Sequence, residues 1–93
     1  AFWFTKAAES GHVYAQLRLG WKYQNGEGVT LSSVQACKWF ELAAMQGEAT
    51  ARKFRDELKS RMAPEEIAEA QRLITAFREN AAAGSQWPQT ELR

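Results

Sequence analysis

Two stretches of similar sequence, FWFTKAAESG at residues 2–11 and KWFELAAMQG at residues 38–47, decide the fold of this 93-residue chain. An internal repeat of this length is typical of architectures built from stacked helix pairs. Each stretch runs from aromatic residues through two alanines to a glycine. This is the pattern of a closely packed helix that ends at a left-handed glycine, and it predicts helix ends at Gly11 and Gly47.

The segment between the two stretches predicts a further helix over residues 12–25. Its apolar residues Ala15, Leu19 and Tyr23 recur every four positions, so they form one face directed at a core. Two glycines within residues 25–29 then favour a tight turn. Ser32 can cap the next helix, with Gln35 three residues later in the pattern of a capping box.

Two more helices are predicted after Gly47. Pro64 fits the first position of the second one, and the acidic residues near this position suit the positive end of a helix. The apolar face of the first helix comprises Ala51, Phe54, Leu58 and Met62. The apolar face of the second comprises Ile67, Ala70, Ile74 and Phe77.

Composition excludes several classes of function. Twelve basic and eleven acidic residues give a net charge of +1, without the strong field of a nucleic-acid binder. No apolar run approaches the roughly 20 residues of a membrane span. One cysteine and one histidine cannot form an ordinary structural zinc site. We therefore expect no nucleic acid, membrane span, metal or cofactor.

The sequence resembles the Sel1-like repeat, a relative of the tetratricopeptide repeat. The match covers residues 15–47, with residues 2–11 as the second helix of a preceding repeat, and the last helices resemble a C-terminal cap. Ala63 stands where such caps usually have Ser or Thr, which weakens the start of the last helix by roughly 1 kcal/mol. The resemblance rests on Ala15, Gln16, Leu19, Gly20, Tyr23, Gly26, Gly28, Val29, Ala36, Trp39, Phe40, Ala43, Ala44 and Gly47.

The resemblance implies an all-α, right-handed α-solenoid of antiparallel helix pairs. We expect one helical domain over residues 1–83, comprising a partial repeat (1–11), a complete repeat (12–47) and capping helices (48–83), followed by a flexible tail at 84–93. The chain lacks an initiator Met and begins on an apolar cluster, so we expect it to be a piece of a longer protein. Residues alone do not determine the compartment. The resemblance slightly favours the periplasm, because such proteins are common in bacteria and often exported.

The resemblance also implies a non-catalytic adaptor or scaffold that binds a protein or peptide on a concave face. Beside its apolar face, the helix predicted at residues 12–25 carries a second stripe of residues, which has the aromatic and arginine content of an interface hot spot. The alternative is that Tyr14 and Trp21 pack against neighbouring helices. The predicted binding residues are Tyr14, Leu17, Arg18, Trp21 and Asn25.

A rival hypothesis treats the segment as the structural end of a longer array whose binding surface lies upstream. In that case the aromatic cluster Phe2, Trp3 and Phe4 would mediate self-association or contact a lost neighbour, since monomers seldom expose such a patch.

No constellation of residues predicts an enzyme. We expect His12 at a helix start and Cys37 as a small buried hydrophobe. The basic residues within 52–61 are interrupted by Asp56 and Glu57, which indicates a solvated face with ion pairs inside the helix.

Overall fold

The computed structural model describes residues 2–84, with side chains from Thr5 to Glu79. This part of the chain contains five α-helices and no strand, so the predicted all-α class is confirmed. Residues 85–93 of the tail expected at 84–93, and the side chains of Phe2, Trp3 and Phe4, lie outside the described residues. The helices are α1 (Phe2–Glu9), α2 (Val13–Asn25), α3 (Ser33–Met45), α4 (Ala49–Lys59) and α5 (Pro64–Gly84).

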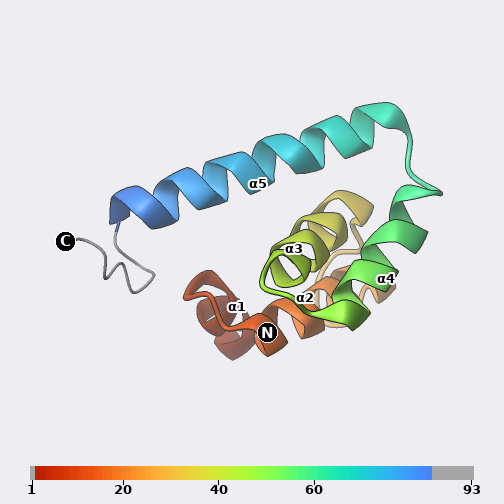
Figure 1. The fold of residues 1–93 in the computed structure, drawn as a ribbon. Coiled ribbons are helices and arrows are strands. Elements are labelled where there is room, and N and C mark those ends of the chain that lie inside the picture. The colour runs from red at the N-terminus through yellow and green to blue at the C-terminus, as the bar shows by residue number, and fades with distance from the viewer. Residues whose placement is uncertain (1, 85–93) are drawn as a thin grey trace.

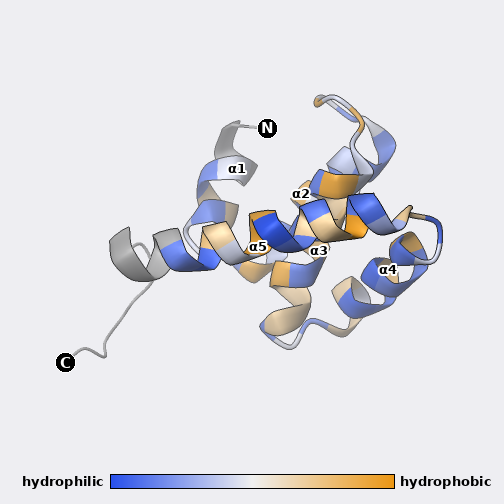
Figure 2. Ribbon diagram, turned by 90° about the horizontal axis from the view of Figure 1, so that it is seen from above, coloured by the Kyte–Doolittle hydropathy of each residue, from blue (hydrophilic) through white to orange (hydrophobic). Residues whose placement is uncertain are grey.

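Consecutive helices from α1 to α4 pack on one another, and the long α5 then turns back across α3 (Figures 1 and 2). As a result α3 lies at the centre, in contact with α2, α4 and α5. Figure 1 shows α5 on one side of α3 and α2 on the other. The right-handed sense expected of a longer stack remains a prediction.

The helix ends follow from local sequence. Gly11 and Gly47 have φ values of 95° and 96°, a left-handed conformation that glycine adopts without strain, so both predicted helix ends are confirmed. The Ser32 hydroxyl accepts a hydrogen bond from the Gln35 backbone N–H at 3.1 Å, as predicted. The His12 ring accepts a hydrogen bond from the Ala15 N–H at 3.3 Å, which places this histidine at the start of α2.

The core forms where the predicted apolar faces meet. Leu19, Phe40 and Cys37 are completely buried. Full burial of one large apolar side chain contributes about 1.5–3 kcal/mol. On α5, Ala70 and Ile74 are buried. Ile67 and Phe77 pack against the core clusters around them, which confirms the predicted apolar face of this helix.

Helix α5 begins at Pro64, as predicted, and it extends through Gly84. Gly84, the expected first residue of the tail, is the last residue of α5. The flexible tail and the other domain bounds stay predictions. The run of alanines at 81–83 explains the extension, because alanine has the highest helix propensity and glycine commonly ends a helix.

Candidate functional site

The stripe predicted on α2 is exposed. Tyr14 and Trp21 retain 58% and 41% of their accessible surface, and Arg18 and Asn25 are also exposed. Ala15 and Leu19, on the opposite face of α2, are buried. The amide of Asn25 donates a hydrogen bond to the carbonyl oxygen of Trp21 at 3.1 Å, so this side chain is held against its own helix.

Trp21 also packs against the neighbouring helix α4. Its ring centroid lies 5.4 Å from that of Phe54, at an interplanar angle of 34°. Phe54 in turn lies 5.5 Å from the buried ring of Phe40. Thus Tyr14 is the more open of the two aromatic residues, while Trp21 combines an exposed edge with an inter-helix contact.

An open hollow of about 200 Å³ lies between α2 and α4. It contains three of the five predicted binding residues, Leu17, Arg18 and Trp21, together with Phe54. Leu17 is half-buried and packs against core clusters. The apolar spacing along α4 predicts Phe54 only as part of its core face, and no pattern within the helix signals the contact of Phe54 with Trp21.

Helix α5 leaves this region uncovered. The exposed stripe on α2 lies on the side of α2 opposite its buried residues. Helix α5 lies on the other side of α3 from α2 (Figure 1). Leu17, Arg18 and Trp21 are therefore accessible from outside the helical stack.

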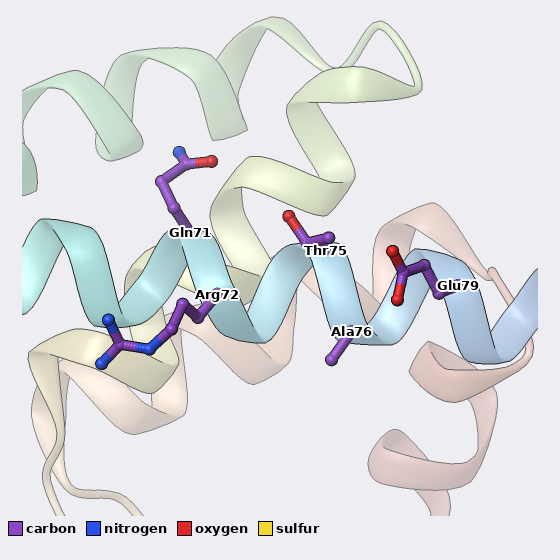
Figure 3. A pocket seen from close by; sticks show the side chains of 5 residues that line it. All are labelled: Gln71, Arg72, Thr75, Ala76 and Glu79. Atoms are coloured by element: carbon purple, nitrogen blue, oxygen red, sulfur yellow. The ribbon is translucent and has the colours of Figure 1, made fainter.

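A second, larger depression of about 380 Å³ follows the outer surface of α5. All of its described lining residues belong to this one helix, and Figure 3 shows Gln71 and Arg72 pointing to opposite sides of it. Arg72 already pairs with Glu69. Among the side chains from Thr5 to Glu79, no second element contributes to the lining of this depression.

The basic residues of α4 are only partly arranged as expected. Arg55 pairs with the adjacent Asp56, but it also contacts Glu41 on α3 at 3.3 Å, and Lys59 lies 3.8 Å from the same carboxylate. The expectation of ion pairs confined to one helix is therefore incomplete. A carboxylate on α3 attracts the two cations that α4 presents one turn apart, an arrangement that intrahelical spacing does not reveal.

Cys37 is the buried thiol among the side chains described. Burial raises the pKa of the Cys37 thiol above its ordinary value, outweighing the nearby cations Lys59 and Arg55. A thiol with a raised pKa is a poor nucleophile at neutral pH. The side chains from Thr5 to Glu79 contain no group of three or more His, Cys, Asp or Glu residues placed to hold a metal ion.

Burial lowers the pKa of Lys38, opposed in part by the charge of Glu9. The Lys38 ammonium lies 4.3 Å from the centre of the Trp39 ring and 5.6 Å from that of Phe77. This cation therefore helps to join α3 to α5, and it is not among the described residues that line the hollow.

The fold defines a helical-repeat protein, in which antiparallel helix pairs stack through small residues and end at glycines. The Sel1 repeat model matches residues 1–12 and 13–48, more than half of the chain, and the chain therefore belongs to the Sel1 repeat family. Sel1 repeats are non-catalytic modules that generally mediate protein–protein interactions. Comparison with curated proteins gave no significant match. Among residues 2–84, no helix has the length and apolar character needed to cross a bilayer.

Proposed function

We propose that this chain is an adaptor module that binds a protein or peptide along the exposed face of α2. The observation that carries the proposal is the gathering of Tyr14, Arg18 and Trp21 on that face, with both aromatic side chains substantially exposed. Tyrosine, tryptophan and arginine are the residues most enriched in interface hot spots. Leu17 and Asn25 complete the proposed binding surface.

Repeat architecture supports a macromolecular partner. Stacked helix pairs form extended curved surfaces, and the resemblance to related arrays implies that the first helix of each repeat lines the concave side. In this proposal α2 and α3 form the one complete repeat and α4 and α5 cap the array. The hollow beside Trp21 is smaller than the roughly 300–1,000 Å³ of a small-molecule site, which favours contact with part of a larger ligand.

The rival proposal is that the chain ends a longer array and associates through Phe2, Trp3 and Phe4. The Sel1 repeat model matches residues 1–12, the segment that contains these three aromatic residues. Light scattering over a range of protein concentrations tests this rival. A dimer that is abolished by Trp3→Ser would support it, and a concentration-independent monomer would contradict it.

A quantitative pull-down from lysate of the native host tests the proposed surface. The bait is the 93-residue chain, compared with the Tyr14→Ala/Arg18→Ala/Trp21→Ala variant, and captured proteins are measured by mass spectrometry. Leu31→Ala/Met45→Ala is the matched control, because Leu31 and Met45 are equally exposed apolar residues elsewhere on the surface. Circular dichroism establishes that each bait is folded.

We expect a specific partner that the triple variant loses and the control retains. If the same proteins bind to all three baits, the α2 face is not the binding surface and the proposal is wrong. Loss of the partner by the Leu31→Ala/Met45→Ala control alone would also contradict the proposal.

A further inference from the structure

We infer that α5 exchanges between two copies of this chain, leaving its own α3 and packing on the α3 of the second copy. The α4–α5 connection, residues 60–63, is the hinge of this exchange, and Pro64 limits how readily it opens. The structure identifies what covers the α3 face, because α5 already lies on it. The inference concerns self-association and does not depend on the α2 surface.

Helix α5 makes its main contact with one helix. Among residues 2–84 it packs chiefly on α3, across which it lies in Figures 1 and 2. The Phe77 ring meets the Trp39 ring edge-on, with centroids 5.5 Å apart. Ala70 and Ile74 are buried in the core clusters to which α3 also contributes. A second copy presents the same α3 face, so an exchanged α5 regains these contacts without any new surface.

The α4–α5 connection differs in composition from the other helix ends. Helices α1, α2 and α3 are each followed by a left-handed glycine, with φ values of 95°, 70° and 96° at Gly11, Gly26 and Gly47. A glycine in this conformation commonly ends a helix. Residues 60–63 contain no glycine, so the change of direction here depends on other residues.

The backbone of the α4–α5 connection is close to helical. Ser60 has φ −66° and ψ −15°, and its N–H still donates to the carbonyl oxygen of Asp56. The N–H groups of Arg61 and Met62 donate to carbonyl oxygens three residues earlier, at 3.0 Å and 3.2 Å. Helical hydrogen bonding thus continues to Met62, and the break between α4 and α5 lies around Ala63.

Pro64 opposes the joining of α4 and α5 into one helix. Inside a continuous helix its ring would clash with the carbonyl group of Ser60, to which proline also has no N–H to donate. Proline disfavours helical torsion angles at the preceding residue, here Ala63. The Ala63 N–H donates instead to the Glu66 carboxylate at 3.0 Å. Because Pro64 is exposed, its influence is on the backbone and not on the core.

A joined α4–α5 helix carries α5 away from its own α3. The chain turns back between α4 and α5 (Figure 1), and a continuous helix removes this turn. The apolar face of α5 and the face of α3 that it covers would then be open to water, which is unfavourable. Two copies that exchange α5 reciprocally cover both faces again.

Refolding from urea at concentrations from about 10 μM to about 1 mM, followed by size-exclusion chromatography with light scattering, tests the inference. The variant is Pro64→Ala, which permits a continuous helix. Pro64→Gly is the matched control, because it also removes the proline ring but disfavours a helix through the connection. Hydrogen exchange read by mass spectrometry then compares the backbone protection of residues 60–63 in dimer and monomer.

We expect Pro64→Ala to form more dimer than the wild type at each concentration, with a dissociation constant at least about 100-fold lower. Pro64→Gly should dimerise no more than the wild type. In the Pro64→Ala dimer, residues 60–63 should gain protection, because they enter a helix. The dimer should also form in Pro64→Ala/Trp3→Ser, which distinguishes it from association through the N-terminal aromatic residues.

Equal dimer fractions in the wild type and Pro64→Ala, including the absence of dimer in both, would overturn the inference. A Pro64→Gly dimer as abundant as that of Pro64→Ala would overturn it as well, and so would a dimer in which residues 60–63 gain no protection. Loss of the dimer in Pro64→Ala/Trp3→Ser would assign the association to the N-terminal residues instead. The pull-down tests the α2 surface separately.

Discussion

The Cδ1 atom of Phe40 lies 2.7 Å from the position that a β-carbon on Gly20 would occupy. Real β-carbons do not approach other atoms this closely, so the contact requires glycine. Phe40 is completely buried and supports Phe54 from below. One small residue on α2 therefore determines how closely α3 approaches and how the wall of the hollow is placed.

Gly20→Ala should accordingly destabilise the domain. Alanine improves helix propensity by about 1 kcal/mol, but forcing a methyl group into a packed core typically costs 1–3 kcal/mol or more. We expect a net loss of roughly 1–2 kcal/mol in the free energy of unfolding, measured by urea denaturation.

The double variant Gly20→Ala/Phe40→Leu provides the control. If steric conflict causes the loss, the two substitutions together should cost less than the sum of their separate costs. Additive costs, or a more stable Gly20→Ala variant, would show that the Phe40 ring can move aside.

Gln16 joins three helices and is completely buried. Its side-chain amide donates a hydrogen bond to the carbonyl oxygen of Ala8 at 3.0 Å, and its Oε1 accepts one from Gln46 at 2.9 Å. Gln16→Met should lower the free energy of unfolding by roughly 1–3 kcal/mol, because buried polar groups lose their partners.

Gln46→Ala provides a comparison within the same network, since the Gln46 side chain also donates to Gly11 but is exposed. We expect this substitution to cost less than about 1 kcal/mol in urea denaturation. Equal costs for the two variants would contradict the central role of Gln16.

Local sequence determined much of this fold in advance. The ends of α1 and α3 at glycines, the Ser32 cap and the start of α5 at Pro64 all depend on residues within a few positions of each other. By contrast, the Gln16 network joins residues up to 35 positions apart. Nothing within α2 indicates where the carbonyl of Ala8 or the side chain of Gln46 will lie.

The candidate site also combines features that local sequence predicts with features that depend on distant residues. Helical spacing predicted that Tyr14, Arg18 and Asn25 share an exposed face, since they depend only on the geometry of α2. Placing Phe54 against Trp21 requires the packing angle between α2 and α4, which intrahelical periodicity does not contain. The same reason explains why Glu41 was not predicted as the partner of Arg55.

The start of α5 offers a stabilising substitution. The Glu66 carboxylate accepts a hydrogen bond from the Ala63 backbone N–H at 3.0 Å, so half of a capping box is present. Ala63→Ser would supply the missing hydroxyl and should raise the free energy of unfolding by roughly 0.5–1.5 kcal/mol in urea denaturation. Ala68→Ser, at an exposed position inside the same helix, should give no gain.

Cys37 should make stability fall at alkaline pH. Burial raises the pKa of its thiol, so the folded state keeps the proton after the unfolded chain has lost it. The associated stability is fully present below the pKa of the unfolded thiol, about 8.5, and is lost as pH rises through the folded value.

Urea denaturation of the wild type and Cys37→Ala between pH 7.5 and 9.5 measures this effect. Subtracting the variant removes the contribution of tyrosines and lysines that titrate in both proteins. We expect the wild-type advantage to shrink with rising pH, whereas a constant difference would contradict an influence of burial on the thiol.

Tyr14 and Trp21 should differ in what they contribute to stability. Tyr14 is 58% exposed, so Tyr14→Ala should change the free energy of unfolding by less than about 0.5 kcal/mol. Trp21 packs on Phe54, and losing an aromatic pair and part of its buried area should make Trp21→Ala cost about 1–2 kcal/mol. Urea denaturation of both variants and of Phe54→Leu measures these costs.

Because a loss of binding by Tyr14→Ala would come without a comparable loss of stability, this variant isolates recognition from folding. A large stability loss on truncating Tyr14 would instead assign that residue to the core and remove it from the binding surface.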